Sequence, residues 1–258
     1  VIYVWIDALI NYISALGFGS SDDWRQWWSD DVEKVHVVGK NVWKFHAVYW
    51  PALLLSAGLP LPDRIVVHGF VTAEGKKIGK SLGNAVDPFA CIDAFGPDAV
   101  RCYLLRAIPP FDDGDFSLDR LRGLYTTDLA NGLGNLVSRL TTLCQRARLG
   151  TANVPAAPEA PSAFTAACDG AEFDKAAAAL WRIVDDLNQQ IEAARPWELL
   201  KAGDLAGLND RLARWLVELH RLAYWLEPLL PAASGRILDA LAQSPLRACP
   251  PLFPRMRN

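Results

Sequence analysis

Short β-rich runs alternate with helical stretches over the first 72 residues, and this alternation limits the possible folds more than any other feature. The runs at 1–5, 34–39 and 64–72 are rich in valine, isoleucine and aromatic residues, which predicts three buried strands. Helical patterns separate these runs. The order strand, helix, strand, helix, strand predicts an α/β domain with a parallel sheet.

Two helical stretches are predicted between the strands. In the first, four apolar residues between 9 and 16 repeat at the spacing of one helix face, and Asp7 lies near its start. A short capped helix is predicted at 22–28. The second long stretch runs from 42 to 57, where Pro51 is expected to kink the helix because proline has no backbone N–H.

The carboxyl ends of the predicted strands carry the residues from which a ligand site would be built. Trp5 ends the first strand, Gly39-Lys40-Asn41 ends the second, and His68-Gly69 lies within the end of the third. Ligands in open parallel sheets bind at this edge. We therefore expect these three positions to lie near one ligand.

Helical patterns dominate the chain after residue 87. A turn-rich stretch at 109–115 is the predicted domain boundary, and only helices are expected beyond it. Long amphipathic patterns follow at 118–148, 173–194 and 210–226, with a proline- and alanine-rich linker at 153–163 between the first two, which predicts an antiparallel helix bundle. The predicted parts are 1–72, the end of an α/β domain; 73–116, a connecting region; and 117–258, a helical domain.

A basic, glycine-containing loop spans residues 74–84, between the third strand and the helix that starts at Asp87-Pro88. Such a loop is a common place for nucleotide phosphates to bind. Gly79-Lys80-Ser81 resembles the end of a P-loop, but Gly75 lies one residue too close and the loop follows the third strand, so that interpretation is rejected. An exposed charged hairpin tip is the alternative.

Composition excludes several classes of protein. The net charge of −3 argues against binding nucleic acid through bulk positive charge. The five cysteines form no Cys-x-x-Cys pair, so no zinc site is predicted, and their scattered positions are typical of reduced thiols in a cytoplasm. The longest apolar run, around 50–55, is too short to span a bilayer. We expect a cytoplasmic protein without a membrane segment or a bound metal ion.

Aromatic and apolar residues of the two helical stretches could converge on one concave pocket. A pocket of this kind suits a flexible thioether, because sulfur packs well against ring edges. The alternative is that these side chains, including the histidine, only fill the core. The candidate residues are Trp5, Ala8, Leu9, Tyr12, His46, Tyr49 and Trp50.

Together these motifs resemble one family, the class I methionyl-tRNA synthetases. The Lys77-to-Ser81 segment is similar to the Lys-Met-Ser-Lys-Ser signature of class I synthetases. The resemblance covers nearly the whole chain, and the order of its motifs is more specific than the loop alone. The matching segments are Tyr3-Val4-Trp5-Ile6-Asp7-Ala8-Leu9-Ile10-Asn11-Tyr12, Gly39-Lys40-Asn41, Phe45-His46, Tyr49-Trp50-Pro51-Ala52, Val67-His68-Gly69-Phe70 and Lys77-Ile78-Gly79-Lys80-Ser81-Leu82-Gly83-Asn84.

The resemblance implies a fold and an activity. It implies the second half of a Rossmann-like catalytic domain, followed by a helical anticodon-binding bundle. The implied enzyme is a methionine–tRNA ligase, which activates methionine with ATP to methionyl-adenylate and then transfers the methionyl group to tRNA(Met). Magnesium would accompany ATP as substrate, and catalysis would rest on positioning and electrostatics.

Roles for individual residues also follow from the resemblance. It implies that Lys77 and Lys80 stabilise the triphosphate as pyrophosphate leaves. ATP binding is implied for His68, Gly69, Lys80 and Ser81, and support of the active site for Asp7 and Asn41. The seven pocket residues named above would bind the methionine side chain. Asn188 and Trp197 resemble the anticodon-side motif, although Trp197 could simply pack the bundle and Asn188 could be a surface residue.

Three departures from the family pattern bear on these roles. Asn41 stands where the family has aspartate, and Gly79 replaces the signature serine. The His-Ile-Gly-His type motif of the family's amino-terminal half is missing from the sequence. Because the chain starts inside a strand pattern without methionine, we expect a fragment that is inactive alone. The alternative function is a non-catalytic tRNA-binding or regulatory remnant.

Another class I synthetase is the third possibility. A leucine or valine enzyme would not need this aromatic lining, and it would need an editing domain to reject near-isosteres. The aromatic pocket therefore favours methionine as the substrate.

Overall fold

The computed structural model describes residues 5–73, 75–78, 84–150 and 154–256, which fold into two compact units. The first unit comprises Val1–Phe70 and Phe111–Asp113, and the second comprises Val71–Pro110 and Gly114–Asn258. Among the described residues, no helix has the length and apolar character needed to cross a bilayer. The predicted division into three parts remains a prediction.

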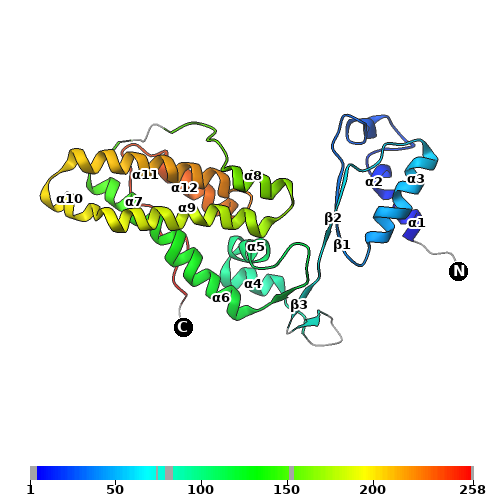
Figure 1. Cartoon of the computed structure of the whole chain (residues 1–258), viewed down its shortest axis with the longest axis horizontal. Coiled ribbons are helices and arrows are strands. Elements are labelled where there is room, and N and C mark those ends of the chain that lie inside the picture. The colour runs from blue at the N-terminus through cyan, green and yellow to red at the C-terminus, as the bar shows by residue number, and fades with distance from the viewer. Residues whose placement is uncertain (1–4, 74, 79–83, 151–153, 257–258) are drawn as a thin grey trace. The chain divides into compact units, whose positions relative to one another are not determined.

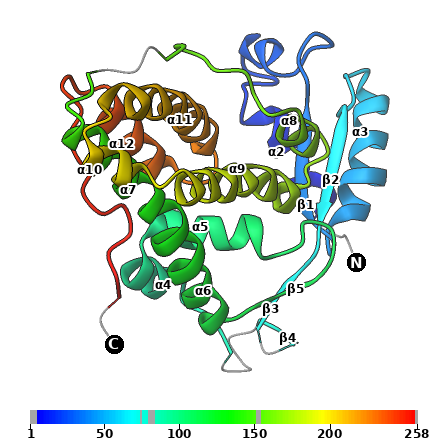
Figure 2. The same ribbon diagram turned by 60° about the vertical axis from the view of Figure 1, so that its left-hand side comes forward.

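The first unit contains a two-stranded parallel sheet with helices packed beside it. Strands β1 and β2 pair in parallel, with Val37 opposite Val66, as the alternating pattern predicted (Figure 2). Parallel strands need a crossover connection, and a helical segment supplies it here. In chain order the elements are α1 (Trp5–Ala8), α2 (Asn11–Ser14), η1 (Asp23–Gln26), β1 (Val35–Gly39), η2 (Phe45–Tyr49), α3 (Trp50–Ala57) and β2 (Arg64–His68).

Two predictions for this unit need correction. Trp5 begins helix α1 instead of ending a strand, and the remainder of that predicted strand, residues 1–4, lies outside the described residues. The helix predicted at 42–57 is divided, because the π-helix η2 ends directly before α3, and the kink expected at Pro51 stays a prediction. A wide turn accommodates the hydrogen bond that proline cannot donate.

One face of β1 is buried in an aromatic core. His36 and Val38 are buried, whereas Val35 and Val37 on the opposite face are exposed, as strand alternation requires. The core also draws on the helices and on the segment before β1. Its buried hydrophobic residues are Leu9, Ile13, Trp24, Trp28, Trp50 and Leu54.

The second unit begins with a small three-stranded sheet in the order β4-β3-β5. Strand β5 (Gly114–Phe116) pairs in parallel with β3 (Val71–Ala73), and β4 (Lys76–Lys77) pairs with β3 in the antiparallel direction. The described elements after β5 are all helices, as predicted, but the turn-rich stretch at 109–115 runs into a strand that was not predicted. Gly114–Phe116, at the end of this stretch, form a strand because they pair with β3, which lies about 40 residues earlier in the chain.

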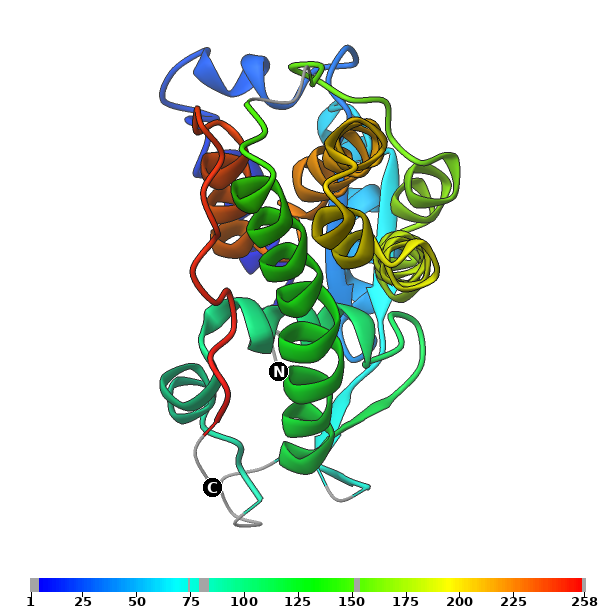
Figure 3. The ribbon, with the colours of Figure 1, turned by 90° about the vertical axis from the view of Figure 1, so that its left-hand side faces the viewer.

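Helices make up the remainder of this unit (Figure 1). The predicted helix at 118–148 is continuous but contains a long π-helical segment, η4, and the C-terminal segment runs beside it (Figure 3). The helices are α4 (Pro88–Phe95), α5 (Pro97–Arg106), α6 (Leu118–Leu124), η4 (Tyr125–Gly134), α7 (Asn135–Arg146), α8 (Ser162–Asp169), α9 (Phe173–Ala194), α10 (Pro196–Ala202), α11 (Leu205–Leu226) and α12 (Pro231–Leu241).

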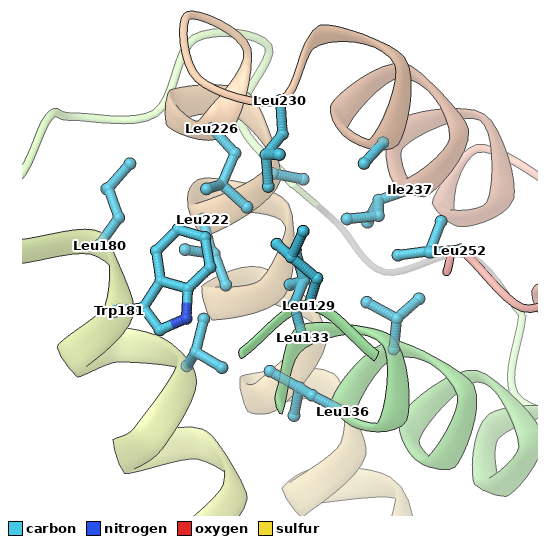
Figure 4. Close-up of a cluster of buried hydrophobic side chains, with 14 of the residues drawn as sticks. Leu129, Leu133, Leu136, Leu180, Trp181, Leu222, Leu226, Leu230, Ile237 and Leu252 are labelled. Atoms are coloured by element: carbon cyan, nitrogen blue, oxygen red, sulfur yellow. The ribbon is translucent and has the colours of Figure 1, made fainter. Parts of the chain in front are cut away.

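Leucine side chains from several of these helices meet in one dry core (Figure 4). Leu129 and Leu133 of η4 point toward Leu222 and Leu226 of α11, and all four are fully buried. The predicted apolar stripes at 173–194 and 210–226 therefore face the core. Burial of this much apolar surface is the main term that holds the unit together.

The Asp98 side chain joins helix α5 to the start of helix α12. The carboxylate is 7% exposed and accepts backbone N–H bonds from Ala232 (3.3 Å) and Ala233 (2.7 Å), at the start of α12. Asp98→Ala leaves these donors unpaired, so we expect the free energy of unfolding in urea to fall by about 2 kcal/mol. Asp93→Ala, at an exposed position of α4, is the matched control and should change it by less than about 0.5 kcal/mol. Equal effects of both substitutions would contradict the capping role.

Candidate functional site

A buried cluster of histidine and aromatic rings forms the interior of the candidate site in the first unit. Tyr12 lies with its ring centroid 5.6 Å from His46 and 5.8 Å from Trp50. His46 is 3% exposed and Trp50 is 1% exposed. Helix α2, the π-helix η2 and helix α3 therefore bring three of the predicted pocket residues together.

Hydrogen bonds fix the orientation of these rings. The Tyr12 hydroxyl lies 2.7 Å from His46 Nε2, and His46 Nδ1 lies 3.0 Å from the carbonyl oxygen of Val42. A carbonyl can only accept, so Nδ1 carries the proton and Nε2 accepts from the tyrosine. Hydrogen bonds therefore hold the His46 ring on both sides, to Tyr12 of α2 and to Val42, which precedes η2.

His36 of β1 belongs to the same cluster, although sequence reasoning did not select it. It is 7% exposed, and its Nε2 accepts a hydrogen bond of 3.1 Å from the Trp50 indole. Burial, with a smaller contribution from the neighbouring His46, lowers the pKa of His36 below its ordinary value. The signal in the sequence is a polar residue at an inward-facing position of a strand that is otherwise apolar there.

The other predicted pocket residues occupy different surroundings. Leu9 is buried in the aromatic core, whereas Ala8 is exposed at the end of α1. Trp5 and Tyr49 are exposed, and both lie against Phe45, with centroid distances of 5.3 Å and 5.6 Å. A cavity of about 480 Å³ lies beside them, and its lining includes Phe45, Tyr49 and Asn41. Its remaining lining residues are Ile6, Trp43 and Lys44.

A carboxylate joins the ends of the two parallel strands. Asp113 Oδ1 lies 2.5 Å from Lys40 Nζ, just after β1, and accepts a bond of 2.8 Å from the backbone N–H of Phe70, just after β2. The Lys40 ammonium also lies 4.6 Å from the centre of the Phe70 ring. Hydrogen bonds from Lys40 and Phe70 lower the pKa of Asp113. The sequence indicated only a turn at Asp113.

Three of the residues predicted at the ligand edge surround the end of β1. A Cβ atom added to Gly39 would lie 2.9 Å from Asn41 Oδ1 and 3.6 Å from the His68 ring. The backbone N–H of Lys40 donates to the His68 carbonyl (3.0 Å). Asn41 and His68 are therefore neighbours across Gly39, as the predicted sheet edge requires. Asp7 is exposed on α1.

The described part of the basic loop is a hairpin between β3 and β4. The backbone of Lys77 pairs with Thr72, and that of Lys76 pairs with Ala73. Asp115 Oδ1 holds the turn, because it accepts bonds from the backbone N–H of Gly75 (2.7 Å) and from the Thr72 hydroxyl (2.8 Å). Lys80 and Ser81 lie outside the described residues, as does Gly79.

The two anticodon candidates lie on different helices of the second unit. The Asn188 amide on α9 donates to the carbonyl oxygens of Val184 (3.0 Å) and Gly132 (3.4 Å), so it ties α9 to η4. Trp197 on α10 is 39% exposed, and the Arg139 guanidinium lies 5.6 Å from its ring centre. An exposed indole beside an arginine can stack on a nucleobase.

Metal-binding potential is limited in the part of the chain that the structure describes. There, His, Cys, Asp and Glu side chains form no group of three or more that could hold an ion.

Comparison with known proteins gives matches to one family. The family model described as "tRNA synthetases class I (M)" matches residues 1–141. Methionine–tRNA ligases from Thermotoga maritima and Mycobacterium bovis are each 38% identical, covering 92% and 95% of this chain but 39% and 50% of their own lengths. The chain thus spans about half the length of these relatives or less.

Solved structures agree with the sequence matches. The Mycobacterium tuberculosis methionyl-tRNA synthetase in complex with methionyl-adenylate is 34% identical, with a TM-score of 0.84. The match covers 99% of this chain and 56% of that one. The apo form of the same protein matches with a TM-score of 0.81.

Gly69, just after β2, packs directly against the backbone of Asp112. A Cβ atom at this position would lie 1.9 Å from the backbone oxygen of Asp112, so Gly69→Ala must displace the segment that carries Asp113. We expect the free energy of unfolding to fall by about 2 kcal/mol in urea titrations. Gly123→Ala is the matched control, because a Cβ atom there meets no atom within 4 Å and alanine favours a helix. Wild-type stability of Gly69→Ala would contradict this close approach.

Proposed function

We propose that this chain, which belongs to the class I (M) tRNA synthetase family, forms the methionine-binding and pyrophosphate-side part of a methionine–tRNA ligase. The complete activity would be ATP-dependent formation of methionyl-adenylate, followed by transfer of the methionyl group to tRNA(Met). The relatives that match over nearly all of this chain carry this name.

The observation that carries the proposal is the part-buried contact between Tyr12 and His46 beside the buried Trp50. Ring edges from three elements meet there, and the hydrogen bond of 2.7 Å supplies a polar group among them. This chemistry suits a thioether, which is polarisable and weakly accepting. The methionine side chain would bind against these rings, and Trp5, Ala8, Leu9 and Tyr49 would complete its pocket.

The second part of the proposal concerns ATP. Lys40 and Asn41 lie at the carboxyl end of β1, with His68 and Gly69 at the end of β2, where α/β sheets bind ligands. Both strands would belong to the second half of a Rossmann-like domain. Lys77 and Lys80 would stabilise negative charge as pyrophosphate leaves. Ser81 would bind ATP, and magnesium would enter as its complex with ATP.

The helical part would contact the tRNA. The proposed architecture assigns 1–72 to the catalytic domain, 73–116 to a connecting region and 117–258 to an anticodon-binding bundle. Trp197 would stack on an anticodon base beside Arg139, whose guanidinium also pairs with Glu192 at 2.9 Å. Asn188 would act mainly by holding η4 against α9.

One observation favours the non-catalytic alternative. Asn41 lies at the end of β1, next to His68, but it lacks the negative charge that the family's aspartate would supply. A tRNA-binding remnant would keep the helical part and tolerate this change. Measurement of adenylate formation separates the two functions.

Adenylate formation should depend on a lysine in the basic loop. The 258-residue chain alone should give no methionine-dependent ATP–pyrophosphate exchange, because its sequence carries no His-Ile-Gly-His type motif. In a polypeptide that joins this chain to the amino-terminal half of the Thermotoga maritima relative, Lys80→Ala should slow the exchange about 100-fold. The affinity for methionine should change little, because the loop acts on phosphates.

Lys76→Ala is the matched control, since Lys76 is an exposed lysine of the same hairpin but lies outside the signature. It should retain most of the exchange activity. Wild-type exchange by Lys80→Ala would remove the phosphate role assigned to the loop. Absence of exchange in the unmodified joined polypeptide would favour the tRNA-binding remnant.

A further inference from the structure

His36 has an environment that its place in a strand does not require. Its ring centre lies 4.6 Å from Tyr12, 5.7 Å from His46 and 5.9 Å from Trp28. It also accepts the Trp50 indole hydrogen bond of 3.1 Å. His36 therefore contacts both halves of the cluster, the Tyr12–His46 pair and the Trp50 indole.

We propose that His36 is a positioning residue for the thioether pocket: its neutral imidazole accepts the Trp50 N–H and holds the indole against Tyr12. The inference rests on the proposed methionine-binding function and adds a residue that the family resemblance did not select. His36 acts through Trp50 and Tyr12, so it is not assigned a contact with the substrate.

The need for such a residue follows from the burial of Trp50. The indole is 1% exposed, and it lies at the junction between η2 and α3. Its N–H requires an acceptor, since an unpaired buried donor is costly. His36 Nε2 supplies that acceptor only when it carries no proton, so the remaining ring proton must be on Nδ1. The neighbouring Trp28 indole is satisfied separately, by the Pro60 carbonyl at 2.9 Å.

The position of the Trp50 ring affects the hydrogen bond between Tyr12 and His46. The Tyr12 ring contacts both partners, with its centre 5.8 Å from Trp50 and 4.6 Å from His36, while its hydroxyl binds His46. Rotation of the indole would therefore remove one wall against which the tyrosine ring packs. The tyrosine would then gain freedom to move its hydroxyl away from His46.

Acid should disrupt this arrangement. Protonation of His36 places N–H groups on both ring nitrogens, so Nε2 would face the Trp50 N–H as a second donor. The titratable groups around His36 are His46 on η2, Tyr12 on α2 and Lys34, which directly precedes β1. The Lys34 ammonium lies 3.0 Å from Asp63 and also donates to two backbone carbonyls. Burial and His46 lower the pKa of His36 below 6.5, so the neutral form holds at pH 7.5 and is lost as the pH falls through that lowered value.

The test is methionine binding by the 258-residue chain, measured by calorimetry at pH 7.5 and at several lower values. His36→Gln keeps an acceptor near the position of Nε2 but cannot titrate, and His36→Leu removes the acceptor at similar volume. At pH 7.5 we expect near wild-type affinity for His36→Gln and about tenfold weaker binding for His36→Leu. Acid should weaken wild-type binding more than it weakens binding by His36→Gln, because only the wild type can protonate the group that accepts the Trp50 N–H.

Trp50→Phe provides a check that does not require methionine. It removes the indole donor and identifies the Trp50 indole resonance in ¹⁵N spectra. The Trp50 resonance should shift on acidification in the wild type and stay in place in His36→Gln. If His36→Leu fails to fold, the comparison of wild type with His36→Gln still decides.

Three outcomes are distinguishable. Equal pH dependence of methionine binding in wild type and His36→Gln would overturn the role of His36 and leave the proposed function intact. A Trp50 resonance that does not respond to acid in the wild type would overturn it as well. Absence of methionine binding at every pH would contradict the proposed function and, with it, the positioning role, even if the resonance shifts.

Discussion

Burial of polar groups among aromatic rings is the constraint on which the first unit depends. Two buried imidazoles, a buried indole and a partly buried phenol lie together, and each buried polar group needs a hydrogen-bond partner there. The partners are one another: Tyr12 binds His46, and Trp50 binds His36. This reciprocal arrangement specifies the ring positions more closely than hydrophobic packing could. A ligand pocket built beside such a core would be rigid before its ligand arrives.

A second constraint joins segments that lie far apart in the chain. Asp113 follows Lys40 by 73 residues, yet its carboxylate binds the Lys40 ammonium and the Phe70 backbone at once. Gly69 permits this approach because no side chain stands between it and Asp112. The segment Phe111–Asp113, about 40 residues after Phe70 in the chain, therefore holds the ends of both parallel strands. The Asp113 carboxylate, the Lys40 ammonium and the Phe70 backbone N–H therefore lie together at the edge where ligands of α/β sheets bind.

The sequence predicted the elements whose patterns are local. Strand β1 and helix α9 were found close to their observed bounds, because alternation and helical spacing depend on near neighbours. The strand predicted at 64–72 is instead two strands, β2 and β3. Trp5 was misassigned because a short apolar run does not distinguish a strand from a helix. His36 and Asp113 were missed for another reason. Their importance comes from partners 14 and 73 residues away; the local pattern marks His36 as a polar residue on an inward face but does not identify its partner.

The central claim is that the Tyr12, His46 and Trp50 cluster forms a pocket for a thioether, and a comparison of two ligands tests it most directly. Norleucine has the length of methionine but replaces sulfur with a methylene group. Calorimetry with the 258-residue chain at pH 7.5 should give methionine about fivefold tighter binding than norleucine, because only sulfur gains favourable contacts with the surrounding rings. Equal affinity for the two ligands, or binding of neither, would contradict the account.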